Sequence, residues 1–265
     1  MTGTRTALIT GASSGIGAAF AEVFASRGFD VIVTARREDR LRALASSVEQ
    51  RCGVRVHVIP ADLAQPGAAS ALCGEIAHRG LTVDALVNNA GFGVPGLYAQ
   101  APWEHQARLL QVMVTSVAEL THRLLPGMIE RHYGRIANVA SLAGLISPPA
   151  GHTLYPAAKA FVISFSEALS EEVGGKNVHV TAVCPGFTVT EFHDVTGTRG
   201  RVQRLPRFMW MDAKTVAEQG FDAVMKGQAV YVNGRVNRGI ATLGRHAPWL
   251  FRRLQRRFSW SFRKT

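Results

Sequence analysis

A glycine-rich turn near the N-terminus, Thr10–Gly17, constrains the fold of this chain more than any other sequence feature. The turn reads TGASSGIG; it follows a short β-rich apolar run, Thr6–Thr10, and precedes a helical pattern at Ala18–Arg27. Glycines allow close backbone approach, and the N-terminus of the next helix offers free N–H groups to a pyrophosphate. Glycine-rich turns also occur as plain structure, but this position between strand and helix favours a dinucleotide site.

Short apolar runs alternate with helical patterns along the rest of the chain. Strands are expected at Val31–Val33, Val54–Ile59, Ala85–Val87, Arg135–Val139, Val178–Val183 and Ala229–Val232. Helices are expected at Leu41–Gln50, Ala68–His78, Trp103–Leu125 and Thr153–Val173. Apolar strands separated by such helices indicate parallel strands joined by crossovers. The sequence therefore predicts a Rossmann-type, doubly wound α/β sheet, in which ligands bind in the loops after the strands.

The organisation of the chain favours a single domain. No linker-like run of Pro, Gly or Ser divides the 265 residues, and their hydrophobic content of 47% is enough for a full core. We expect a cofactor-binding domain at residues 1–234, which includes a substrate loop at 191–212, and a basic helical extension at residues 235–265.

The cysteines and histidines argue against a disulfide framework and a metal site. The three cysteines form no CxxC pair and the nine histidines form no HExxH pair, which favours a reducing, cytoplasmic setting. The N-terminus enters an apolar strand within a few residues, which leaves no room for a secretory signal. No apolar stretch approaches the roughly 18 residues that span a bilayer.

Positive charge is concentrated near the C-terminus. The formal net charge is +11, and the last acidic residue is Asp222. Residues 248–263 combine Phe and Leu at helical spacing with four arginines elsewhere around the helix. Such a helix can lie on an anionic membrane, here the inner membrane surface, or can dock on its own domain or on a neighbouring subunit. Nucleic-acid binding is disfavoured because no recognised binding motif accompanies the charge.

The end of the second predicted strand discriminates between nicotinamide cofactors. An NAD enzyme places a carboxylate there for the ribose 2′-hydroxyl, whereas the 2′-phosphate of NADP calls for arginine. Here Val33 leads to Arg36 and Arg37, and the first carboxylate is Glu38. Arg36 is the better-placed phosphate partner, which favours NADP(H). The alternative is that both arginines are solvated residues that open a helix.

Three residues after the fifth predicted strand form a candidate catalytic group. Ser141 follows that strand, and Tyr155 and Lys159 lie four apart on one helical face. A nearby ammonium favours the phenolate and lowers the pKa of a tyrosine, which can then act as general acid or base. A serine hydroxyl beside it would hold the substrate oxygen as charge develops.

With these motifs, the sequence resembles the short-chain dehydrogenase/reductase family over about Thr6 to Val232. The resemblance rests on TGASSGIG, Asp62-Leu63, Asn88-Asn89-Ala90-Gly91, Ser141, Tyr155, Lys159 and Pro185-Gly186 with Thr190. It implies a hydride-transferring oxidoreductase with a nicotinamide cofactor and a carbonyl or alcohol substrate. The cofactor residues that we expect are Gly11, Ser13, Ser14, Gly15, Ile16, Gly17, Arg36, Asp62, Leu63, Asn89, Ala90, Gly91, Tyr155, Lys159, Pro185, Gly186, Thr188 and Thr190.

One position departs from the family pattern. Met113 stands where the family usually carries an Asn that supports a water-linked proton relay to the lysine, and a thioether cannot replace the hydrogen bonds of the amide. The relay could still run through a backbone carbonyl and water. Because Met113 replaces this Asn, the alternative function is a non-catalytic NADP(H)-binding protein, or a membrane-associated protein that resembles the family.

The substrate loop, 191–212, is rich in apolar residues. It contains Phe192, Leu205, Phe208, Met209, Trp210 and Met211 among several arginines. An apolar cover suggests a hydrophobic substrate, although the same residues could serve as ordinary packing. We also expect the protein to form a homo-oligomer.

Overall fold

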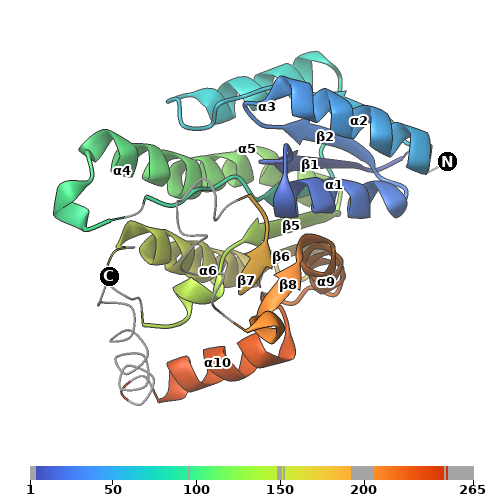
Figure 1. Cartoon of the computed structure of the whole chain (residues 1–265). Coiled ribbons are helices and arrows are strands. Elements are labelled where there is room, and N and C mark those ends of the chain that lie inside the picture. The colour runs from blue at the N-terminus through green and yellow to red at the C-terminus, as the bar shows by residue number, and fades with distance from the viewer. Residues whose placement is uncertain are drawn as a thin grey trace.

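The computed structural model describes residues 4–94, 96–147, 151, 153–191, 206–247 and 249 (Figure 1). The strands are β1 (Thr6–Thr10), β2 (Asp30–Thr34), β3 (Val56–Val58), β4 (Ala85–Asn88), β5 (Gly134–Val139), β6 (Val178–Cys184), β7 (Phe187–Val189), β8 (Trp210–Asp212) and β9 (Val230–Val232). The helices are α1 (Gly15–Ser26), α2 (Glu38–Cys52), α3 (Ala68–His78), α4 (Trp103–Leu110), α5 (Ser116–Glu130), α6 (Leu154–Glu172), α9 (Ala213–Met225) and α10 (Arg235–His246).

Seven parallel strands form the main sheet, in the order β3-β2-β1-β4-β5-β6-β9. This confirms the predicted Rossmann-type sheet. The strand order reverses direction between β1 and β4, and a crevice is expected at the carboxyl ends of two such strands. The glycine-rich turn follows β1, and Asn89 follows β4, so both border that point.

Helices cover both faces of the sheet (Figure 1). On one face, α1, α2 and α9 pack against β1 and β2 through side chains that include Phe20, Phe24, Leu41 and Phe221. On the other face, α3, α5 and α6 bury side chains such as Leu72, Leu120 and Ala158 against the strands. Continuous apolar strands are required because both faces of a parallel sheet are covered.

Several features of the structure were not predicted from the sequence. A second, two-stranded sheet joins β7 and β8, so the end of the predicted substrate loop is a strand, and α9 follows it directly. The predicted helix Trp103–Leu125 is α4, a π-helical turn at Gln111–Thr115 and α5, and it ends five residues later than expected. The helix α10 begins the C-terminal extension, which the sequence predicts to be basic and helical.

The C-terminal extension is only partly described. Gly244 of α10 lies so close to Ile146 that an added Cβ would be 2.8 Å from its side chain, so α10 packs on the main fold. The predicted amphipathic segment 248–263 lies outside the described residues except for Trp249, which is exposed. Among the described residues, no helix is long and apolar enough to cross a membrane. The domain boundary at residue 234 and the membrane contact stay predictions.

Candidate active site

The glycine-rich turn forms a cradle in which side chains have no room. Gly11 has a φ of +66°, and a Cβ there would lie 2.8 Å from the amide nitrogen of Asn89. A Cβ on Gly17 would lie 2.3 Å from the carbonyl oxygen of Gly11. Ser14, the N-cap of α1, makes no side-chain capping bond to the helix. The backbone N–H groups at the start of α1 therefore fit a phosphate, as the sequence predicts.

Asn89 fixes this turn from the neighbouring strand β4. Its side-chain amide donates to the carbonyl oxygens of Thr10 at 3.0 Å and Gly11 at 3.3 Å. In return, the Thr10 hydroxyl accepts hydrogen bonds from the backbone N–H groups of Asn89 and Ala90. The side chain of Asn89 thus supports the glycine-rich turn, and the predicted cofactor contacts of Asn89, Ala90 and Gly91 stay predictions.

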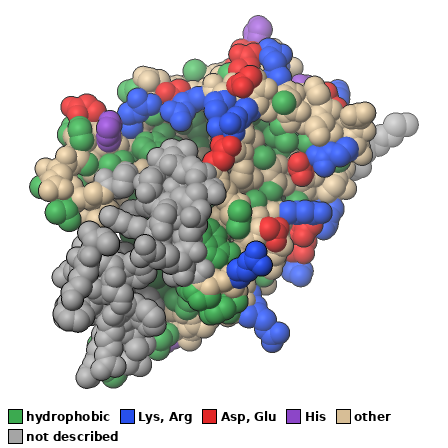
Figure 2. Space-filling view, viewed as in Figure 1, with side chains coloured by type: hydrophobic (Ala, Val, Ile, Leu, Met, Phe, Trp, Pro, Cys, Tyr) green, Lys and Arg blue, Asp and Glu red, His purple; other side chains and the backbone are tan. Residues whose placement is uncertain are grey.

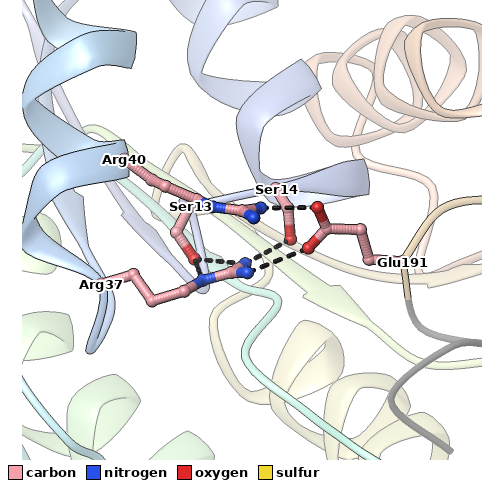
Figure 3. Close-up of polar contacts among 5 residues, drawn as sticks. All are labelled: Ser13, Ser14, Arg37, Arg40 and Glu191. Atoms are coloured by element: carbon pink, nitrogen blue, oxygen red, sulfur yellow. Dashed lines mark hydrogen bonds and ion pairs between the residues drawn. The ribbon is translucent and has the colours of Figure 1, made fainter.

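The guanidinium of Arg37, which the sequence ranks behind Arg36 as a phosphate partner, binds the glycine-rich turn (Figure 3). It donates to the Ser13 hydroxyl at 3.0 and 3.2 Å and to the Ser14 hydroxyl at 2.9 Å. It also forms an ion pair with Glu191 at 3.0 Å, and Arg40 binds the second oxygen of the same carboxylate at 2.5 Å. These two arginines lower the pKa of Glu191 to about 2. The sequence signal for this role was a second arginine directly after Arg36.

Arg36, the predicted phosphate partner, lies in the loop between β2 and α2 and is exposed. Its guanidinium forms no hydrogen bond or ion pair with any residue that the structure describes, so it is available to a ligand. Figure 2 shows Lys and Arg side chains along the upper part of the visible face, beside a hollow lined by hydrophobic side chains.

The residues after β3 and β4, which the sequence predicts to contact the cofactor, are held by both polar and apolar contacts. Asp62 accepts a hydrogen bond from the N–H of Ala64 and pairs with Arg108 at 3.4 Å. Leu63 is buried in the core. A Cβ on Gly91 would lie 3.5 Å from the side chain of Met113, so the thioether is adjacent to the backbone of Gly91.

Ser141, Tyr155 and Lys159 meet at the carboxyl end of β5. Ser141 is hydrogen-bonded to the Tyr155 side chain and caps a 3-10 turn by accepting from the N–H of Ala143 at 3.1 Å. Lys159 is buried, donates to the carbonyl oxygen of Val139 at 2.6 Å, and its ammonium lies 5.8 Å from the centre of the Tyr155 ring. The structure thus brings the three side chains together, and their catalytic roles stay predictions.

Burial governs the proton affinities of this group. Burial lowers the pKa of Lys159 to about 8 and raises the pKa of Tyr155, while the hydrogen bond with Ser141 opposes the rise at the phenol. The sequence predicts that Lys159 lowers the pKa of Tyr155; in this structure the pKa is raised instead, because burial is the largest influence on the phenol. Tyr155 is therefore a protonated phenol at neutral pH, which suits the general-acid role in reduction.

A buried polar network holds the ends of β4 and β5 against α5 and α6. The Asn88 amide donates to Asn138 at 2.9 Å and to Thr121 at 3.2 Å. The Asn138 amide donates to Ser166 at 2.9 Å, and Ser166 donates to the carbonyl oxygen of Val162. Because α6 also carries Tyr155 and Lys159, this network fixes the helix relative to Ser141.

The loop after β6 closes the site from the other side. Pro185 accepts a hydrogen bond from the N–H of Leu142, next to Ser141. A Cβ on Gly186 would lie 2.5 Å from Asn237 of α10, and Thr188 is buried and donates to the carbonyl oxygen of Gly186. Thr190 lies against Gly15, where a Cβ would be 3.0 Å from the threonine methyl. The predicted cofactor residues on this loop therefore contact both the catalytic group and the glycine-rich turn.

Residues 5–199 match the family model described as short chain dehydrogenase. Nodulation protein G of Rhizobium sp. (strain N33) is 35% identical over 243 residues, which cover 87% of this chain and 96% of that protein. A short-chain dehydrogenase from Sphingobium yanoikuyae, solved with NADPH, has a TM-score of 0.80 at 31% identity and covers 98% of this chain and 96% of its own. A short-chain dehydrogenase/reductase from Burkholderia phymatum, solved with NAD, has a TM-score of 0.80 at 27% identity and covers 91% and 92%.

Proposed function

We propose that this chain, which belongs to the short-chain dehydrogenase/reductase family of oxidoreductases, is an NADP(H)-dependent enzyme. Its proposed substrate is a hydrophobic carbonyl compound or alcohol. The observation that carries the proposal is the arrangement of Ser141, Tyr155 and Lys159 beside the glycine-rich turn. The bound nicotinamide supplies the hydride in reduction and accepts it in oxidation.

Each catalytic side chain has a role that follows from its surroundings. In reduction, Ser141 orients the substrate oxygen, and Tyr155, whose raised pKa keeps the phenol protonated, donates the proton to that oxygen. The Lys159 ammonium, held by Val139, stabilises the phenolate that forms. In oxidation, the same proton moves in the opposite direction, from the substrate hydroxyl to the tyrosine.

The preference for NADP(H) rests on the end of β2. Arg36 is exposed there without a partner among the described residues, and the segment that directly follows β2 carries no carboxylate before Glu38 that would bind a ribose 2′-hydroxyl. The solved relatives contain NADPH in one case and NAD in the other, so family membership alone does not decide between them.

The proposal of a hydrophobic substrate rests on apolar residues in the loop after β4 and in the second sheet. Phe92 and Val94, in the loop after β4, pack on the same core cluster as Tyr155. On the side of the second sheet, the rings of Phe187 and Trp210 are 5.7 Å apart, and Phe208 is exposed. Apolar walls with a few polar groups are typical of sites for such ligands.

One experiment tests this function. The purified protein is incubated with a panel of hydrophobic ketones and aldehydes, with NADPH or NADH in parallel, and the loss of reduced nicotinamide is followed by absorbance. We expect turnover with NADPH and less with NADH. NADPH binding without turnover across the panel, in both directions, would instead support the non-catalytic alternative.

A further inference from the structure

The Glu191 carboxylate occupies an arginine-lined anion site beside the glycine-rich turn (Figure 3). One carboxylate oxygen is 3.0 Å from Arg37, and the other is 2.5 Å from Arg40. Glu191 comes from the loop after β7, about 150 residues from the arginines along the chain, so this contact is made by the fold. The three side chains are 40–45% exposed, which leaves the site open to a ligand.

The site also has the chemistry that a phosphate needs. Arginines bind carboxylates and phosphates in the same geometry, so a bound carboxylate marks a place that a phosphate could take. The Ser13 and Ser14 hydroxyls accept hydrogen bonds from Arg37. Their own protons therefore remain available to an anion at the rim of the turn.

We propose that Glu191 is an internal competitor for the phosphate of the cofactor. Its carboxylate holds Arg37 and Arg40, and a nucleotide with a 2′-phosphate gains these arginines by displacing it. Glu191 is thus a specificity-determining residue that acts against NADP(H) binding, in opposition to the arginines. This inference rests on the proposed preference for NADP(H).

The strength of this competition follows from exposure and charge. Half-exposed ion pairs are individually weak, so we expect the loss of both Glu191 contacts to change phosphate affinity by about three- to tenfold. With a pKa of about 2, Glu191 is ionised at every physiological pH, so the competition does not vary with pH there. It should weaken as salt screens the charges.

The test compares the wild type with Glu191→Gln by calorimetric titration with two nucleotides that carry no nicotinamide. The first, 2′,5′-ADP, has the 2′-phosphate, and the second, ADP, has only the 5′-diphosphate. We expect Glu191→Gln to bind 2′,5′-ADP about three- to tenfold more tightly and ADP with little change. The gain should shrink at high salt.

Glu38→Gln is the matched control. Glu38 lies in the first turn of α2 and pairs with Arg42, so this variant removes the same charge nearby without freeing Arg37 or Arg40. We expect it to bind 2′,5′-ADP nearly as the wild type does. Circular dichroism of each variant verifies that the fold is retained.

Three outcomes would overturn the inference. Weaker binding of 2′,5′-ADP by Glu191→Gln would show that Glu191 positions the arginines for the ligand. Unchanged binding of 2′,5′-ADP, or a gain that Glu38→Gln matches, would show that Glu191 does not compete with the phosphate. An equal gain for ADP would assign the site to the 5′-diphosphate. Failure of the proposed preference for NADP(H) looks different, because the wild type would then bind neither 2′,5′-ADP nor NADPH.

Discussion

The Lys159 ammonium lies 5.8 Å from the centre of the Tyr155 ring and donates a hydrogen bond to the carbonyl oxygen of Val139. The two side chains are one helical turn apart on α6, while Val139 ends β5, so helix and sheet together set their separation. Gly144 allows this close approach, since a Cβ there would lie 2.7 Å from the backbone of Lys159. Tyr155 and Lys159 therefore have separate proposed roles, proton donation and stabilisation of the phenolate, and the first two predictions test one role each.

The first prediction concerns proton transfer. Tyr155→Phe removes the hydroxyl that meets Ser141 but keeps the ring and its packing. We expect turnover to fall by about two to four orders of magnitude, the range attributed to general acid–base catalysis. NADPH affinity, measured by titration, should be nearly unchanged. Near-normal turnover in this variant would refute the role of Tyr155.

The second prediction is the pH dependence of carbonyl reduction. The pKa of Lys159 is lowered to about 8 by burial, so the ammonium that stabilises the phenolate is lost as pH rises through this value. The pKa of Tyr155 is raised, so the proton donor itself persists. We expect the reduction rate to fall above about pH 8. The Cys184 thiol, with a pKa of about 12, cannot cause that fall. A rate that stays constant to pH 10 would contradict this role of Lys159.

The third prediction concerns the glycine-rich turn. In Gly17→Ala, the new methyl would lie 2.3 Å from the Gly11 carbonyl oxygen, so the turn must shift. We expect a loss of about 1–3 kcal/mol in unfolding free energy, together with weaker nucleotide binding. Gly74→Ala is the control, because Gly74 lies inside α3 with no atom within 4 Å of an added Cβ. That variant should gain roughly 0.5–1 kcal/mol. Equal effects of the two substitutions would disprove the packing argument.

The sheet was predictable because its strands are continuous apolar runs that turn residues clearly separate from the helices. Both bounds of β1 are as predicted, and those of β4 and β5 agree to within one residue, since burial on both faces leaves a clear pattern. The helix α9 was not predicted, although the sequence offers an aspartate as its N-cap. In the structure, the Asp212 carboxylate accepts a hydrogen bond from the N–H of Thr215 at 2.7 Å. The strands β7 and β8 have three residues each, too few for a periodic pattern.

The site was predictable only where chemistry depends on spacing along one element. Tyr155 and Lys159 share a helical face, so their proximity followed from the sequence. The ion pair between Arg37 and Glu191 joins two loops that are far apart in the sequence, so no local sequence pattern predicts it. The dominance of burial at Tyr155 likewise depends on neighbours from several elements, which the sequence does not bring together.

The fourth prediction concerns cofactor preference. Arg36→Asp replaces a guanidinium that pairs with none of the described residues by a carboxylate, which loses the proposed phosphate contact and adds repulsion. We expect NADPH to bind at least about tenfold more weakly, with a relative gain for NADH. Arg42→Asp, at an exposed position further along α2, serves as the charge control. If both variants lose NADPH affinity equally, the effect is general charge and not a contact of Arg36.

The last prediction concerns Met113. This side chain is 1% exposed, packs in the core with Leu109 and Leu120, and contacts the position of Gly91. The surrounding π-helical turn, Gln111–Thr115, has the wider hydrogen-bond spacing that can leave a backbone carbonyl available to water. A relay to Lys159 therefore does not require an amide side chain here, and an amide would enter an apolar environment.

Met113→Asn should therefore lose about 1–3 kcal/mol of stability, because the buried amide lacks partners, and its turnover should not rise. Met113→Leu is the control, since a substitution of similar volume costs less than about 1.5 kcal/mol. Melting temperature, turnover and the solvent isotope effect are measured for both variants. A faster Met113→Asn enzyme with an unchanged melting temperature would show that the family's amide relay is missing here and limits the rate. A slower, less stable variant would show that this core has adapted to the thioether, with proton transfer served by the backbone.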